Sequence, residues 1–210
     1  MTALPARTCL PTRRNALRAC VRAVELLHSG VDRNPIRKVL EFFPLGAVPS
    51  VSFRFKLEQA SPVRAAVRTR DGVWHVGGTW VDSAGGGCTA PGATRQDGSW
   101  SRTLGEVSGK VFPSTPAPGA AGDLATRLRV RVMHPMDTGL VGGIPAFYVN
   151  KLSVRDERGT ELLRMNSFEP VSENPVFSFD FKGLPAGRLR LTGTDNNGNR
   201  LDSVIERGAE

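Results

Sequence analysis

The sequence predicts an all-β protein: two β-sandwich modules, the first of them incomplete, preceded by a short N-terminal helix. Three observations carry this prediction. The 210 residues include 23 glycines and 15 prolines, which interrupt the chain too often for long helices. Apolar residues alternate with polar ones over short runs, the period of a half-buried strand. Turn-forming residues separate these runs at regular intervals.

Segment 1–30 differs from everything after it. Its apolar residues recur at helical spacing, at Leu17, Val21, Val24 and Leu27. Residues 12–17 have the outline of a twin-arginine export signal, but Arg18, Arg22 and Glu25 interrupt the apolar core that an export peptide requires. We expect an irregular or helical N-terminal segment over 1–30.

Residues 31–88 form the predicted first module. In segment 51–58 the apolar Val51, Phe53, Phe55 and Leu57 alternate with polar residues, which predicts a strand. Residues 63–68 and 73–81 are expected to pair through a turn at Asp71-Gly72, with Trp74 and Trp80 in a core or an interface. The module ends in Gly85, Gly86, Gly87 and Cys88.

Residues 89–122 are rich in glycine and proline and are interpreted as a linker, with residues 105–112 as a possible short strand within it. Residues 123–206 form the second module, an immunoglobulin-like sandwich of six short strands. The expected strands are 127–133, 146–154, 161–166, 176–181, 188–194 and 200–205. The expected core is Val130, Val132, Val149, Leu152, Phe177, Phe179, Leu189 and Leu191.

Bulk composition excludes several function classes. The net charge is +8, but the seven arginines of the first 37 residues have no aromatic residues between them for base stacking, which argues against nucleic-acid binding. No apolar stretch is long enough to span a membrane. The three cysteines, Cys9, Cys20 and Cys88, form no C-x-x-C pair, and neither a metal site nor a cofactor is predicted.

Two candidate positions for chemistry remain. Cys88 follows three glycines, which suit either a slim arm that delivers a reactive thiol to another protein or a glycine-rich turn with an incidental cysteine. His134 lies at a strand end, without a second residue at metal-ligand spacing or an acid/base partner. The residues therefore indicate no enzyme.

Four motifs in order give a resemblance. His134 to Leu140, Ile144-Pro145, Ser172 to Pro175 and Thr194 to Gly198 resemble the Z subunit of the bacterial sulfur-oxidation (Sox) carrier. Upstream, Asn34-Pro35, Phe53 to Phe55, Val63 to Ala65 and Gly86 to Pro91 are similar to the back half of a SoxY-like domain, in the fused SoxYZ-like form associated with quinoprotein dehydrogenases.

The resemblance implies that Cys88 is the covalent attachment site for a sulfur intermediate and that Gly85, Gly86 and Gly87 form a mobile arm. The arm departs from the family pattern, because it is internal and Cys88 is followed by Thr-Ala-Pro, where the carrier has Gly-Gly. We expect Cys88 to be the most reactive thiol, on a mobile loop that reaches solvent. Four residues of the 134–145 loop are expected at the interface between the modules: His134, Met136, Ile144 and Pro145.

Two functional hypotheses follow. In the first, the protein is a non-enzymatic sulfur carrier whose partners are sulfur-oxidation enzymes and anionic sulfur compounds. In the second, it is a periplasmic binding module that docks a quinoprotein dehydrogenase or a cytochrome and carries no sulfur. The resemblance implies a periplasmic location. Because it begins near Asn34, we also expect the first module to have an open or helix-covered edge and to be less stable than the second.

Overall fold

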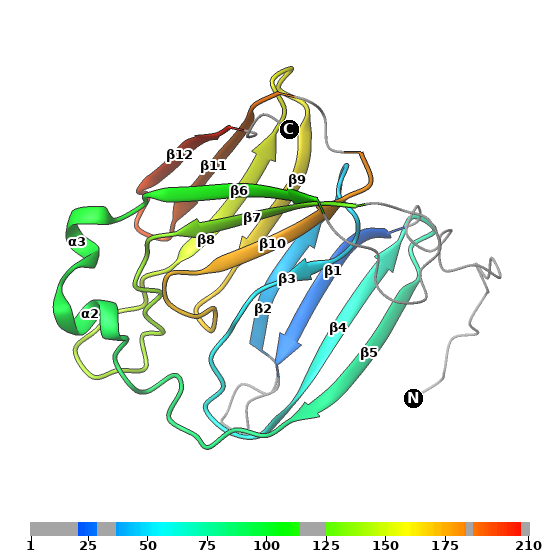
Figure 1. The fold of residues 1–210 in the computed structure, drawn as a ribbon. Coiled ribbons are helices and arrows are strands. Elements are labelled where there is room, and N and C mark those ends of the chain that lie inside the picture. Colours follow the sequence, from blue (N-terminus) through cyan, green and yellow to red (C-terminus); the bar gives the residue numbers. More distant parts are fainter. Residues whose placement is uncertain (1–20, 29–36, 114–124, 184–186, 207–210) are drawn as a thin grey trace, which may run out of the picture.

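The computed structural model describes residues 21–28, 37–113, 125–183 and 187–206 (Figure 1). Nearly all of its regular structure is β. The elements are β1 (Val21–His28), β2 (Arg37–Phe43), β3 (Val51–Ser52), β4 (Ser61–Thr69), β5 (Trp74–Val81), α2 (Ala93–Asp97), α3 (Trp100–Thr103), β6 (Val107–Pro113), β7 (Thr126–Val132), β8 (Val149–Arg155), β9 (Glu161–Ser167), β10 (Val176–Phe181), β11 (Leu189–Asp195) and β12 (Arg200–Ile205).

The strands form two antiparallel sheets. The larger has eight strands in the order β12-β11-β8-β9-β2-β1-β4-β5, and the smaller has four in the order β3-β10-β7-β6. In Figure 1 the smaller sheet crosses in front of one part of the larger sheet, while β4 and β5 extend beyond it. The all-β, sandwich-like fold predicted from the sequence is confirmed.

The six strands predicted between residues 127 and 205 are all present, with bounds shifted by at most a few residues. The alternation of the sequence becomes an alternation of burial, as in β10, where Phe177, Phe179 and Phe181 point into the core. All eight predicted core residues are at most 2% exposed. A tight turn joins β11 to β12, with Gly198 at a φ of 88°.

Strands from both predicted modules contribute to one core. Strand β2 pairs with β9, and its Phe42 stacks on Phe179 of β10 with ring centroids 5.6 Å apart. Burying such a side chain contributes about 1.5–3 kcal/mol. The two modules are therefore separate along the chain but share one hydrophobic core.

The N-terminal helix prediction is wrong for residues 21–28, which form strand β1, while residues 1–20 lie outside the described residues. Strand β1 pairs with β2 on one side and with β4 on the other, with a register shift on each side. Helix propensity differs little between residue types, so two rows of backbone hydrogen bonds override it. The spacing of apolar residues within segment 21–28 contains no information about these partner strands.

The linker interpretation is wrong for residues 93–113. Helices α2 and α3 lie here, and β6 pairs with β7 along its whole length. The strand suggested for residues 105–112 is thus confirmed as β6. Glycine allows this strand to pack closely, since a Cβ at Gly109 would lie 2.5 Å from the Ile205 side chain.

Candidate functional site

The glycines before Cys88 are required by the backbone path. Gly85 and Gly86 have φ angles of 91° and 76°, a conformation that residues with a Cβ rarely adopt. At Gly87 a Cβ would lie 2.5 Å from the Leu57 carbonyl oxygen. The arm, defined here as residues 85–88, thus passes tightly against the chain segment that precedes β4.

Cys88 is 7% exposed, so the expectation that it reaches solvent is wrong for this conformation. The Thr138 hydroxyl donates a hydrogen bond to the Cys88 carbonyl oxygen, at 2.5 Å, from the loop that follows β7. Gly85 and Gly86 themselves are exposed. Cys88 is therefore buried while the two glycines at the start of the arm are exposed, and we call this position of the arm retracted.

The Glu58 carboxylate is the second anchor of the arm. One oxygen accepts the Cys88 N–H at 2.8 Å, and the other accepts the Thr89 hydroxyl at 3.0 Å. The hydrogen bond from Cys88 is the largest cause that lowers the pKa of Glu58, and the backbone N–H groups of Thr89 and Gly86 act in the same direction. The Glu58 carboxylate thus holds the arm by accepting hydrogen bonds from its backbone N–H groups.

The loop that begins at His134 contacts the arm, the segment between β3 and β4, and helix α2. Lys56 donates from Nζ to the Met136 carbonyl oxygen at 3.2 Å, and Arg95 of α2 forms an ion pair with Asp137. His134 and Met136, two of the four residues expected at the interface, are completely buried in this loop. Ile144 and Pro145 instead lie in a turn in which the Ile144 N–H donates to the Val141 carbonyl.

His134 is a structural histidine at neutral pH. Burial is the largest cause that lowers its pKa, to about 4, against the opposing effect of the Asp195 charge. Its Nδ1 accepts the Met136 N–H at 3.1 Å, so the proton of the neutral ring lies on Nε2, 3.5 Å from the Asp195 carboxylate. The ring therefore accepts a hydrogen bond from the loop backbone and is uncharged at neutral pH.

The segment after Cys88 is fixed by a second set of contacts. Glu173 accepts both the N–H and the hydroxyl of Thr94, at 3.1 and 2.9 Å, and Asn174 donates to the same hydroxyl at 3.0 Å. Arg95 stacks over Trp100 with its guanidinium 4.4 Å from the ring centroid. The chain directly after the arm is therefore fixed to the loop that contains Glu173 and Asn174.

Sequence reasoning found Cys88, the glycines and the 134–145 loop, but assigned no role to Glu58, Thr138 or Glu173. These three side chains bond to residues 30 to 79 positions away in sequence. For Glu58 the one available signal was a carboxylate at the end of an alternating run. Among the described residues, no group of His, Cys, Asp and Glu side chains is suited to hold a metal ion.

Comparison with known families assigns both parts of the chain. Residues 12–88 match the family of the sulfur oxidation protein SoxY, and residues 116–205 match the family of the sulphur oxidation protein SoxZ. The chain is a fused SoxYZ-like protein. The SoxY match covers β1 to β5 and ends at Cys88, and the SoxZ match covers β7 to β12. No curated protein matches the chain.

The two domains give the SoxYZ-like protein a carrier or accessory role in sulfur oxidation, with sulfur-oxidation enzymes as partners. SoxY and SoxZ are non-catalytic accessory proteins of sulfur oxidation. Of the helices that the structure describes, none is long and apolar enough to cross a membrane.

Proposed function

We propose that this protein carries a sulfur intermediate covalently on Cys88 and presents it to sulfur-oxidation enzymes in the periplasm. The observation that carries the proposal is that the SoxY match ends at Cys88, directly after three glycines that the backbone path requires. Sox proteins are usually periplasmic, which supports the location. The sulfur compound is anionic, with thiosulfate as the simplest candidate.

The loading step needs a thiolate and an oxidant. Cys88 loses its proton, and its sulfur forms a bond to the terminal sulfur of thiosulfate, giving Cys88–S–S–SO₃⁻. Forming this bond releases two electrons. A partner oxidising enzyme or its cytochrome takes them up.

Loading also requires the arm to leave its retracted position, because a thiol that is 7% exposed cannot enter another protein's active site. The anchors of the arm are the Glu58 carboxylate and the Thr138 hydroxyl. Local opening of a segment held by a few hydrogen bonds costs much less than global unfolding. Gly85 to Gly87, which have no side chains, can then enter another protein's active site together with the cysteine.

Intact-protein mass spectrometry tests the proposal. The protein is incubated with thiosulfate and sulfur-oxidation enzymes, and we expect an adduct that maps to the peptide containing Cys88 and is released by a reducing agent. Cys88→Ser must lose the adduct, while the matched variants Cys9→Ser and Cys20→Ser must keep it.

The opposite result supports the second hypothesis. If the wild-type protein binds a quinoprotein dehydrogenase or a cytochrome but gains no adduct, it is a docking module and Cys88 carries no sulfur. An adduct that persists in Cys88→Ser places the attachment on another residue.

A further inference from the structure

The outer face of the smaller sheet contains arginines whose charges the sheet does not balance. Strand β7 presents Arg127, Arg129 and Arg131 on this face, alternating with buried apolar residues. Arg127 lies opposite Asp180 of β10 and forms an ion pair with it at 2.8 Å. Arg129 and Arg131 lie opposite Ser178 and Val176, which carry no charge. Strand β10 therefore neutralises Arg127 but not the other two arginines of β7.

The neighbouring strand adds charge of the same sign. Lys110 of β6 lies directly opposite Arg129, and Ser108 lies opposite Arg131. Like charges directly opposite each other in a sheet are destabilising. Arg190 of β11, by contrast, forms an ion pair with Asp202. Arg129, Arg131 and Lys110 thus bring three positive charges together on one face of the smaller sheet.

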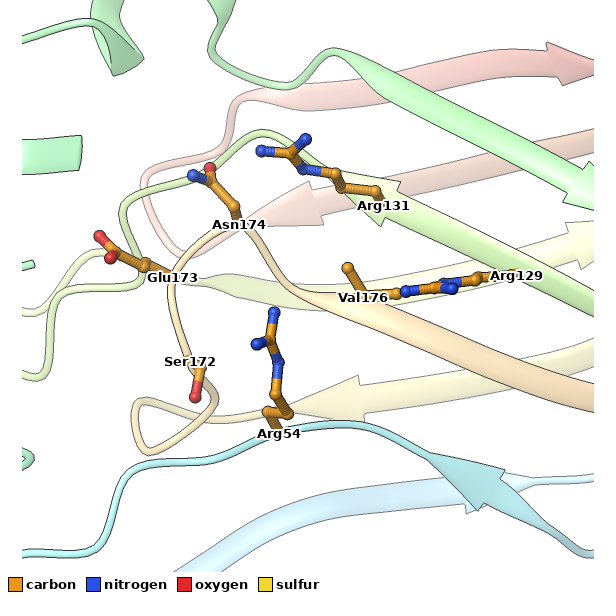
Figure 2. A pocket seen from close by; sticks show the side chains of 7 residues that line it. All are labelled: Arg54, Arg129, Arg131, Ser172, Glu173, Asn174 and Val176. Atoms are coloured by element: carbon orange, nitrogen blue, oxygen red, sulfur yellow. The ribbon is translucent and has the colours of Figure 1, made fainter. Parts of the chain in front are cut away.

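A pocket of about 490 Å³ lies where these arginines converge. Arg54, from the segment after β3, joins Arg129 and Arg131 in lining it, as Figure 2 shows. The remaining lining residues are Ser172, Glu173, Asn174 and Val176. Glu173 is the one carboxylate in this set, and its Oε2 oxygen accepts two hydrogen bonds from Thr94.

The walls of the pocket are fixed before any ligand binds. Asn174 and His134 bond to each other twice through their backbones and the Asn174 side chain, at 2.8 and 3.1 Å. The Ser172 N–H donates to the Arg54 carbonyl at 3.0 Å, which holds the third arginine beside the loop. A rigid concave site with convergent donors is typical of small-ligand binding.

We propose that this pocket binds a small tetrahedral oxyanion of the sulfate and thiosulfate class. Guanidinium groups donate paired hydrogen bonds that match the oxygen atoms of such anions, and the Ser172 hydroxyl adds a further donor. The assignment to sulfur oxyanions rests on the proposed function. The pocket also shares Glu173 and Asn174 with the contacts to Thr94, six residues after Cys88.

Isothermal titration calorimetry with thiosulfate and with sulfate tests the site in the Cys88→Ser protein, where no adduct can form. We expect saturable binding to one site and competition between the two anions. Replacing both Arg129 and Arg131 by Gln weakens binding at least about tenfold, because two charge-assisted contacts are lost. Arg131→Lys gives a smaller loss, because it keeps the charge without the paired donors.

The matched control is Arg158→Gln, which removes one exposed arginine in the turn between β8 and β9. It must bind thiosulfate as the parent does, and thermal melting confirms that each variant is folded. Three outcomes overturn the proposal: no saturable binding, an equal loss in Arg158→Gln, or binding of an acidic peptide with none of thiosulfate. Failure here leaves adduct formation on Cys88 unaffected, and failure of the adduct leaves anion binding unaffected.

Discussion

An interior strand and an edge strand of the eight-stranded sheet, β9 and β5, differ sharply in burial. Strand β9 lies within the part that the smaller sheet covers, and four of its seven residues are buried. Strand β5 pairs with β4 along its whole length, yet none of its residues is buried. In Figure 1 none of the described strands or helices forms a second layer over β4 and β5. A second layer, and not strand pairing, creates the core of this protein.

Strands β4 and β5 show that strand pairing without a covering layer leaves apolar side chains exposed. Trp74, Val76 and Trp80 of β5 are 46, 64 and 62% exposed, so the two tryptophans are not core residues. The main apolar cluster includes residues of β2 and of β7 to β12, and none of the described residues of β4 and β5. The open edge expected for the first module is therefore found at β5.

The largest expected effect compares one aromatic residue from each region. Phe179→Ala should lower the free energy of unfolding by about 3–5 kcal/mol, because the ring is completely buried between Phe42 and Phe177. Trp80→Ala should lower it by less than about 1 kcal/mol, because the larger side chain is mostly in solvent. Urea unfolding of both variants measures the difference. Equal losses would mean that β5 is covered in solution.

The second prediction compares two histidines. The unfolded chain binds a proton on His134 near pH 6.5, and the folded protein binds it only near about pH 4. The stability that neutral His134 contributes is thus complete above pH 6.5 and decreases as the pH falls toward 4, by about 2 kcal/mol between pH 6.5 and 5. Unfolding measured across this range should show that decrease.

His134→Gln should remove this part of the pH dependence. His75→Gln, at an exposed position of β5, should leave it in place and is the matched control. An unchanged pH dependence in His134→Gln would show that the buried ring does not cause it.

The smallest expected effect concerns the arm, which connects the two regions. Glu58, before β4, and Thr138, in the covered region, hold Cys88 from opposite sides. Glu58→Ala should increase the rate of Cys88 alkylation by iodoacetamide about threefold to tenfold, because the arm opens more often. Mass spectrometry after short labelling times measures the rate at each cysteine.

The control for this prediction is Glu106→Ala, which removes an exposed carboxylate just before β6. It should leave the rate at Cys88 unchanged. A rate that is the same in Glu58→Ala and in the wild-type protein would show that Glu58 does not hold the arm closed.

Part of the site could be read from the chain and part could not. Three glycines before a cysteine are a local signal, and the φ angles of Gly85 and Gly86 agree with it. The burial of Cys88 depends on Glu58 and Thr138, 30 and 50 residues away. No local pattern encodes such contacts. The basic pocket combines Arg54 with two arginines more than 70 residues later, and was likewise not predictable.

The sequence by itself determined the all-β fold, the six strands from β7 to β12 and their core, because burial on one face forces a period of two that is visible in the residues. Only the tertiary structure decided that residues 21–28 form a strand, since their apolar spacing predicts a helix and the strand depends on pairing with β2 and β4. It also decided that β6 joins the smaller sheet and that Cys88 is retracted. In each case the deciding atoms lie far away in the chain, and only folding brings them together.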